Sequence, residues 1–332
     1  MRFAVMGVGG IGGCFGGRLA AAGHDVLFIA RGAHLAALQA DGLKLTSALG
    51  DLRLPHVIAR PNATGAVPAD VVVVAVKGPD IAAAAEAIAP LIGPRTIIVP
   101  FMNGVEHVEI LQRRYGASAI VPGISYVAAV IEGPGHVRHV GSGNRWLVGS
   151  VEGNVTGSVV HGVEGSGDSG VGHERASTLA AFAAAATQAG LGVEVTADIL
   201  RALWEKFVLL GAFTAVACLS RLPVGTWTRE PETLGLFVDG MREIVAVAAK
   251  QGVSLEGARL IEANLAFMHS LEPDWKGSML NDLERGKPIE IESLSGYVHR
   301  LGRALGVPTP LHSTAYRALY HHAGSRAARP RP

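Results

Sequence analysis

The sequence has little cysteine, few aromatic residues and no excess of either charge. Only two of its 332 residues are cysteines, Cys14 and Cys218, and they lie far apart in apolar stretches. This excludes a disulfide framework and a CxxC metal or redox site, and we expect a cytoplasmic protein. The 29 basic and 28 acidic side chains nearly cancel, and no basic run is interleaved with aromatic residues. Nucleic acid is therefore not an expected partner.

Long apolar runs and metal-ligand patterns are also missing. The longest uncharged helical run, residues 207–220, is too short to span a bilayer and is typical of a buried core helix. Glycines interrupt the apolar N-terminus, so we interpret it as retained rather than as a signal peptide. The close groups of metal-ligating side chains, at 106–109 and 321–322, lack the HExxH spacing. We therefore expect neither a membrane span nor a metal site.

Glycine, in contrast, is abundant, and its spacing near the N-terminus is informative. An apolar strand runs into Gly7-Val8-Gly9-Gly10-Ile11-Gly12, and an amphipathic helix over about 13–22 follows. This spacing is typical of a dinucleotide-binding loop. Gly7 would permit the tight turn, Gly9 would let the backbone approach a pyrophosphate, and Gly12 would let the helix pack on the strand. We assign this loop, with Gly10 and Ile11 at the positive helix N-terminus, to cofactor binding.

The end of the second predicted strand indicates which cofactor binds. This strand spans 25–30 and leads to Arg31, about 19 residues beyond the last glycine of the loop. An acidic residue there would hold the ribose 2′-hydroxyl of NAD, but Ala30 and Arg31 occupy the place. Because a guanidinium suits a 2′-phosphate, the sequence predicts NADP(H).

The order of patterns along the chain predicts two domains. Strand patterns near 2–7, 25–30, 71–76, 96–100 and 119–122 alternate with helical ones, as a parallel sheet requires. After residue 174 helical patterns dominate, at 175–190, 198–220, 231–251, 255–269, 275–285, 289–305 and 310–322. The predicted fold class is an α/β Rossmann dinucleotide-binding domain over 1–193, followed by an all-α C-terminal domain over 194–322.

Three further stretches have distinct compositions. Residues 150–172 are rich in Gly, Ser and Val without periodicity, which predicts a flexible surface excursion. The tail, 323–332, contains Arg and Pro and is predicted to be disordered. Short strands around a Gly-Pro-Gly turn between 125 and 148 predict a hairpin at a sheet edge.

Polar side chains follow the carboxyl ends of two predicted strands. Lys77 comes directly after the strand at 71–76, and Asn103-Gly104 follows the strand at 96–100. Open α/β sheets bind ligands at this edge, so both side chains are candidates for contact with cofactor or substrate. The alternatives are an ordinary loop lysine and a turn-forming Asn-Gly pair.

The helical half contains further candidates. Lys206 shares one face of its predicted helix with four apolar residues, Ile199, Leu203, Leu210 and Phe213. It either reaches solvent at the helix edge or lies in a cleft with a lowered pKa, ready to donate a proton. Ser278 and Glu290 can converge if the helices around them fold back. The alternatives for these two are a helix cap and a solvated face.

Together these motifs resemble those of the ketopantoate reductase (2-dehydropantoate 2-reductase) family. The resemblance covers nearly the whole chain, through the glycine loop, Arg31, Val76-Lys77, Asn103-Gly104, 203–207, 277–282 and 290–292. It implies an NADPH-binding Rossmann domain joined to an all-α domain, with the active site in the cleft between them. It also implies the reduction of 2-dehydropantoate to (R)-pantoate in pantothenate biosynthesis.

The resemblance also implies a role for each candidate residue. Lys206 would be the general acid, and Glu290 would hold the substrate hydroxyl beside the cofactor, with Ser278 close to it. Arg31 would bind the 2′-phosphate, while Lys77 and Asn103 would lie along the cofactor and substrate.

Two substrate-facing positions depart from the family pattern. The family's lysine helix usually carries asparagines four and eight residues after the lysine, where this chain has Leu210 and Thr214. Losing a polar contact weakens discrimination between substrates. A relative that reduces another, bulkier or more apolar 2-keto acid therefore stays open, as does a non-catalytic NADP-sensing protein. A 2-hydroxy acid dehydrogenase working oxidatively is a further alternative, against which Arg31 argues, and a homodimer is left open.

Overall fold

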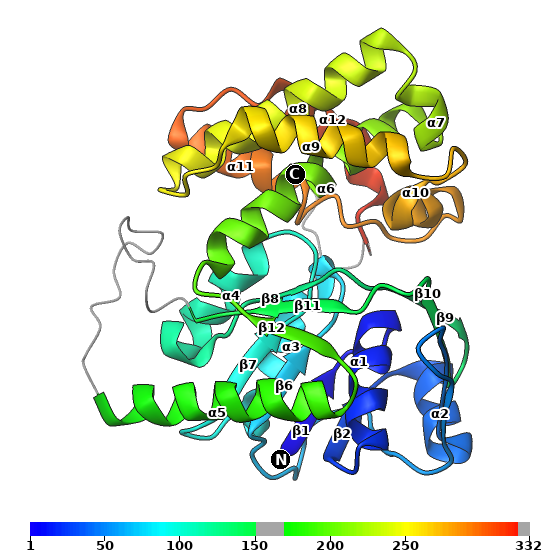
Figure 1. Cartoon of the computed structure of the whole chain (residues 1–332), viewed down its shortest axis with the longest axis vertical. Helices are drawn as coiled ribbons and strands as arrows, with labels where there is room; N and C mark the ends of the chain where they lie inside the picture. Colours follow the sequence, from blue (N-terminus) through cyan, green and yellow to red (C-terminus); the bar gives the residue numbers. More distant parts are fainter. Residues whose placement is uncertain (151–168, 325–332) are drawn as a thin grey trace. The chain divides into compact units, whose positions relative to one another are not determined.

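The structure is a computed structural model, which describes residues 1–150 and 169–324 (Figure 1). Most of the predicted excursion and nearly all of the predicted tail lie outside these residues. At two places the described chain differs from these predictions. A helix already begins at Ser169, and Ala323 is buried and forms a bridge with Ile289.

The contacts divide the described chain into two units. The first contains residues 1–102, 107–150 and 169–199, and the second contains 103–106 and 200–324. The sequence places the boundary after residue 193. In the structure strand β12 (Gly192–Val195) pairs with β11 (Arg145–Val148), so the chain stays in the first unit as far as Ile199.

A five-stranded parallel sheet organises the first unit. Its order is β5-β2-β1-β6-β7, with β1 (Arg2–Met6) paired between β2 (Asp25–Ile29) and β6 (Val71–Val74). The outer strands are β5 (Ile58–Arg60) and β7 (Ile97–Pro100). The helices of this unit are α1 (Gly10–Ala21), α2 (Gly32–Asp41), α3 (Ile81–Ala87), α4 (Glu106–Tyr115) and α5 (Ser169–Gln188), with 3₁₀ turns η1 (Gly78–Asp80), η2 (Ala89–Leu91) and η3 (Ala117–Ala119). The first residue of α4, Glu106, belongs to the second unit. This sheet with its helices confirms the predicted Rossmann-type fold.

The predicted strand at 119–122 is wrong. The segment forms only isolated bridges with the β7 region, between Ile98 and Ile120 and between Phe101 and Gly123. Pro122 lies between the two bridges and has no N–H to donate to a ladder, which explains why a regular strand does not form there.

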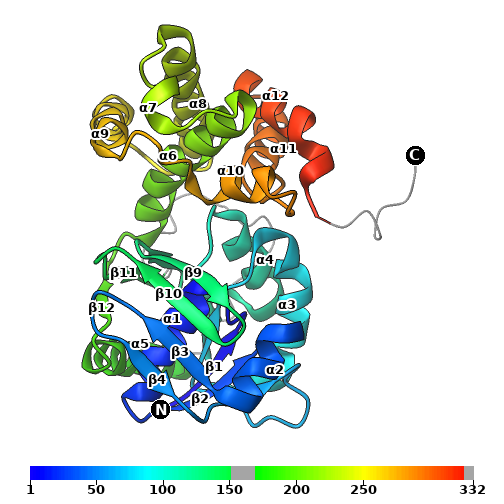
Figure 2. The same cartoon turned by 90° about the vertical axis from the view of Figure 1, so that its right-hand side faces the viewer.

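Two smaller sheets complete the first unit. One has the order β4-β3-β10-β9 and the other β12-β11-β8, with β3 (Leu43–Thr46), β4 (Leu52–Leu54), β8 (Gly123–Ser125), β9 (Ala128–Gly133) and β10 (His136–Val140). The predicted hairpin is β9–β10, but β10 pairs with β3, so the hairpin belongs to a separate sheet rather than to the Rossmann sheet. Helix α1 packs on β1 and β2 of the parallel sheet and on the strands of the β4-β3-β10-β9 sheet (Figure 2).

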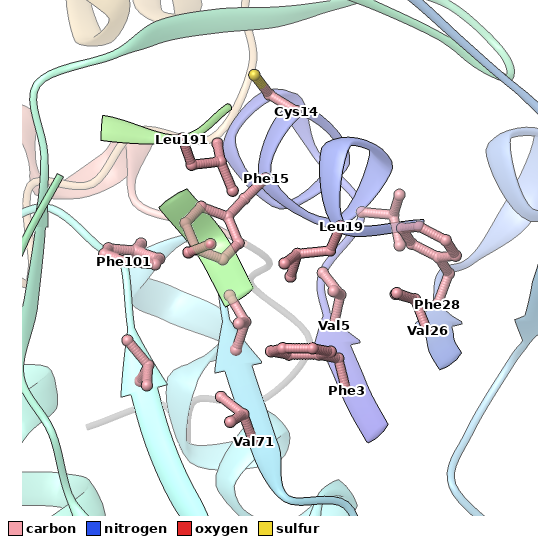
Figure 3. Packing of buried hydrophobic residues seen from close by; sticks show 14 of the residues in the cluster. Phe3, Val5, Cys14, Phe15, Leu19, Val26, Phe28, Val71, Phe101 and Leu191 are labelled. Atoms are coloured by element: carbon pink, nitrogen blue, oxygen red, sulfur yellow. The ribbon is translucent and has the colours of Figure 1, made fainter. Parts of the chain in front are cut away.

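The apolar side chains of α1 point into the core of the first unit. Phe15 and Leu19 are fully buried and lie over Phe3 and Val5 of β1 (Figure 3). The ring of Phe15 also packs on Phe101, with centroids 5.0 Å apart. This packing fixes α1, and with it the glycine loop that precedes the helix.

The second unit is helical apart from its connections. Its elements are α6 (Ile199–Ser220), α7 (Val224–Trp227), α8 (Pro231–Lys250), α9 (Gly257–Ser270), α10 (Gly277–Glu284), α11 (Ser295–Leu305), α12 (Pro310–Leu319) and the 3₁₀ turn η4 (Tyr320–His322). The helix predicted over 289–305 begins only at Ser295. Ile289 instead donates its N–H to the carbonyl of His322, 3.0 Å away, so the start of this segment is tied to the end of the described chain.

Helix α6 extends beyond the uncharged run at 207–220 and begins at Ile199. With 22 residues and a mean hydropathy of 1.6 over its most apolar window, it is long and apolar enough to cross a membrane. However, 67% of that window is buried, which is typical of a core helix.

Candidate active site

The glycine loop has the geometry of a phosphate-binding turn. Gly7 follows β1 at a φ of +94°, in the left-handed region that favours glycine. The first i to i−4 hydrogen bond of α1 runs from the N–H of Gly13 to the carbonyl of Gly9, 2.8 Å away. The N–H groups before Gly13 therefore form the positive end of the helix.

The other loop glycines differ in the space around them. An added Cβ at Gly9 would meet nothing within 4 Å, whereas one at Gly12 would lie 2.1 Å from the carbonyl oxygen of Gly7. At Gly10 it would lie 2.0 Å from the carbonyl oxygen of Ala129 on β9. Gly12 and Gly10 thus allow α1 to pack closely on both sides, and Gly9 leaves room over the loop. These residues fit the pyrophosphate of a dinucleotide.

Arg31 lies where the sequence placed it, but it has a partner that the sequence did not reveal. It immediately precedes α2, and its guanidinium donates to Asp80 Oδ2 at 2.9 Å. Asp80 ends the 3₁₀ turn η1 after β6, and exposed Lys77 precedes the same turn. Both side chains of the ion pair are exposed, at 78% for Arg31 and 45% for Asp80. Because exposed pairs contribute little stability, this one leaves Arg31 free to exchange partners.

Lys206 is the centre of a polar group in the second unit. It is half-buried on α6, and its Nζ donates to Asn103 Oδ1 at 3.4 Å. Burial lowers the pKa of Lys206 from 10.5 to about 8, while the negative charge of Glu290 raises it. Of the two alternatives for Lys206, the structure therefore favours the enclosed amine over the solvated one. At neutral pH the amine of Lys206 is therefore mostly protonated, and it gives up this proton more easily than an ordinary lysine does.

The remaining substrate candidates lie on α6 and α10. Leu210 is half-buried one turn beyond Lys206, and Ser278 is exposed in the first turn of α10. Thr214 is buried, and its hydroxyl lies 2.8 Å from the carbonyl oxygen of Leu210, to which it donates. That hydroxyl is therefore engaged within its own helix. The substrate roles of these three residues stay predictions.

Sequence reasoning missed a charged cluster beside this group. Arg300 of α11 donates from Nη2 to Glu106 Oε1 at 2.7 Å and from Nη1 to Glu292 Oε2 at 3.3 Å. The hydroxyl of Tyr316 donates to the same Glu292 oxygen at 3.1 Å. Arg300 and Glu106 are 194 residues apart in sequence, so no local pattern joins them.

Comparison with known families decides what kind of protein this is. Residues 3–153 match the family described as Ketopantoate reductase PanE/ApbA, and residues 198–323 match Ketopantoate reductase PanE/ApbA C terminal. The chain belongs to the ketopantoate reductase family. The resemblance drawn from the motifs is thus confirmed, and the protein is an oxidoreductase of a family of NAD(P)H-dependent reductases.

Individual relatives match over nearly their full length. A 2-dehydropantoate 2-reductase from Mesorhizobium japonicum is 30% identical, over 93% of this chain and 94% of that protein. The solved structure of a PanE/ApbA family ketopantoate reductase from Ralstonia eutropha is 31% identical, with a TM-score of 0.80 over 97% of this chain and 98% of that one. The ternary structure of a D-mandelate dehydrogenase with NADH and anilino(oxo)acetate has a TM-score of 0.83 over 97% and 98% of the two chains; at 20% identity it shares the fold.

Proposed function

We propose that this protein reduces 2-dehydropantoate to (R)-pantoate with NADPH, as a step of pantothenate biosynthesis. The observation that carries the proposal is the half-buried Lys206 with Asn103 and Glu290 around it, in a chain of the ketopantoate reductase family. An enclosed amine that holds its proton at neutral pH is suited to act as a general acid.

The chemistry assigned to Lys206 is proton donation to the substrate. When bound, NADPH would supply the hydride for the keto carbon. As the carbonyl oxygen gains negative charge, the ammonium of Lys206 stabilises it and donates a proton to it. Asn103 accepts a hydrogen bond from Nζ and so orients the amine. Glu290 opposes the effect of burial on the pKa of Lys206 and so keeps the amine charged before the reaction.

We assign the preference for NADPH over NADH to Arg31. Its guanidinium is exposed beyond β2 and pairs with Asp80 across an exposed contact that a 2′-phosphate can replace. Arg31→Ala should raise the KM for NADPH more than the KM for NADH. Equal effects on both cofactors would contradict the assignment.

A second candidate function is the reduction of a more apolar 2-keto acid. Leu210 presents no hydrogen-bonding group one turn from Lys206, and the hydroxyl of Thr214 is engaged by its own helix. Both features favour a substrate with an alkyl or aryl side chain over the hydroxylated side chain of 2-dehydropantoate.

The deciding experiment follows NADPH oxidation by the purified protein with 2-dehydropantoate, pyruvate, 2-oxoisovalerate and phenylpyruvate. Lys206→Ala should reduce turnover by a factor on the order of a hundred or more while NADPH binding is retained. Lys250→Ala, which changes an exposed lysine at the end of α8, is the matched control and should be active.

Each outcome of this experiment has a distinct meaning. Preferred, Lys206-dependent turnover of 2-dehydropantoate supports the first function, and turnover of an apolar keto acid alone supports the second. NADPH binding without turnover of any keto acid would instead indicate a sensor. Wild-type turnover by the Lys206 variant would contradict the role of this residue.

We further propose a cytoplasmic location, with a small keto acid as the partner molecule. Cys14 and Cys218 are both buried free thiols, which suits a reducing compartment. A homodimer stays a prediction, to be checked by light scattering of the purified protein.

A further inference from the structure

We propose that Arg300 is a positioning residue that holds Asn103 and Glu290 in place around Lys206. It does so through the two carboxylates that it binds, those of Glu106 and Glu292. The proposal rests on the function proposed for Lys206. It concerns residues of the second unit only.

The contacts of Arg300 join two segments that are distant in sequence. Its Nη2 donates to Glu106 Oε1 at 2.7 Å and to the main-chain carbonyl of Glu292 at 3.2 Å. Its Nη1 donates to Glu292 Oε2 at 3.3 Å, and Tyr316 of α12 donates its hydroxyl to the same oxygen. The Arg300 guanidinium therefore ties Glu106 to Glu292, and the Tyr316 hydroxyl ties Glu292 to α12.

Each anchored carboxylate is close in sequence to a partner of Lys206. Glu106 comes three residues after Asn103, and Glu292 comes two residues after Glu290. Residues 103–105 and 290–294 precede the helices α4 and α11 and lack a regular helical ladder of their own. Buried Val105, Ile291 and Leu294 anchor the two segments in the core. The ties to Arg300 add to that order, because turns without a helical ladder hold their shape weakly by themselves.

The backbones of the two segments also meet directly. Gly104 has a φ of +83°, and a Cβ added to it would lie 2.9 Å from the carbonyl oxygen of Ser293. The hydroxyl of Ser293 donates back to the carbonyl of Glu290 at 3.2 Å. A shift of either segment would therefore be passed on to the other and to the two groups around Lys206.

The cluster differs from an ordinary surface ion pair. Glu106 and Glu292 are only 23% and 28% exposed, and Arg300 is 43% exposed. Two separate Nη atoms reach two carboxylates and a carbonyl, an arrangement that a planar guanidinium can make and a lysine ammonium cannot. Several linked contacts fix a geometry better than one exposed pair does.

The first test measures turnover of whichever keto acid the wild-type protein reduces. Arg300→Gln should lower kcat by roughly tenfold or more, because displaced positioning groups are costly even when the chemistry is intact. Arg300→Lys should recover part of the loss. The control is Arg242→Gln on α8, whose exposed partner is Asp239 at 3.0 Å, and it should leave kcat unchanged.

The second test reads the amine of Lys206 without any turnover. Reductive ¹³C-methylation of the cofactor-free protein gives one NMR signal per lysine, and the Lys206→Ala spectrum assigns the signal of Lys206. In the described contacts Glu290 is the charge that raises the pKa of this amine. If Arg300→Gln lets Glu290 recede by an ångström or two, the pKa of Lys206 should fall by roughly half a unit to one unit.

The two tests together separate positioning from stability and from the proposed function. If the pKa of Lys206 is the same in Arg300→Gln as in the wild type, or shifts equally in Arg242→Gln, the proposal is overturned. If Arg300→Gln does not fold, the pKa of Lys206 must fall in Arg300→Lys and in Glu106→Gln, by less than is expected for Arg300→Gln. If it does not fall in these variants, the proposal fails. A pKa shift in a protein that reduces no keto acid would sink the proposed function and leave the positioning role standing.

Discussion

Replacing Lys206 with methionine should stabilise the protein at neutral pH while it abolishes proton donation. Methionine keeps a flexible chain of similar length and removes the charge. The pKa of Lys206 is lowered from 10.5 to about 8, mainly by burial. At 1.36 kcal/mol per unit, this corresponds to about 3 kcal/mol of unfavourable free energy for keeping the amine charged in the folded state.

The sign of the pH dependence follows from the lowered pKa. Between pH 8 and 10.5 the unfolded chain still holds the proton that the folded protein has released, so wild-type stability rises with pH across this window. Below pH 8 the full cost is present. Lys206→Met lacks the amine. Its free energy of unfolding should therefore exceed that of the wild type by about 3 kcal/mol less at pH 10.5 than at pH 7.

Urea unfolding of the cofactor-free proteins at several pH values measures this difference. Tryptophan fluorescence is suited to it, because Trp204, Trp227 and Trp275 lie in the helical unit and only Trp146 lies in the first unit. The control is Lys250→Met, at an exposed lysine, for which the difference should be small at every pH. A difference between Lys206→Met and the wild type that is the same at pH 7 and pH 10.5 would refute a lowered pKa for Lys206.

Three further predictions concern the fold and the loop. Gly12→Ala should lower the midpoint of thermal unfolding, because its Cβ would lie 2.1 Å from a main-chain oxygen, whereas Gly9→Ala should leave that midpoint unchanged and weaken NADPH binding in a fluorescence titration. Glu243→Ala should cost about 2 kcal/mol in urea unfolding, because this buried carboxylate accepts the N–H groups of Leu311 and His312 at 2.7 and 3.0 Å and so caps α12 from α8. Burial lowers the pKa of His312 from 6.5 to about 4, so wild-type stability should fall as the pH drops through that window, and His312→Phe should lose this part of the acid sensitivity in the same assay.

The Rossmann-type half could be predicted from the sequence because its signals are local. Gly7 to Gly12, the valine run of β6 and the helical repeat of α1 each report on a few neighbouring residues. The strand predicted at 119–122 failed because apolar content says nothing about which partner supplies the hydrogen bonds. For the same reason the sheet formed by β3, β4, β9 and β10 was not predicted, since β3 finds its partner about 90 residues away in β10.

For the candidate site, the sequence indicated the candidate side chains but not the charged residues that pair with them or lie near them. Lys206, Asn103 and Glu290 each stood out by their place at a strand end, on an apolar face or in a family motif. Asp80 and Arg300 did not, because the positions of their partners are set by tertiary contacts. Whether Lys206 was enclosed could not be decided from α6 either, since that helix is apolar on nearly all sides.

Residues 103–106 belong to the helical unit, although the chain on either side of them belongs to the first unit. This bears on protein engineering within the family. A chimera that takes its C-terminal half from a relative, joined near residue 200, would combine a foreign helical unit with this chain's own Asn103 and Glu106. Glu106 would then come from one parent and the residue at position 300, whose guanidinium lies 2.7 Å from Glu106 in this chain, from the other. A swap that keeps this ion pair within one parental sequence therefore has to move this four-residue segment together with the helices.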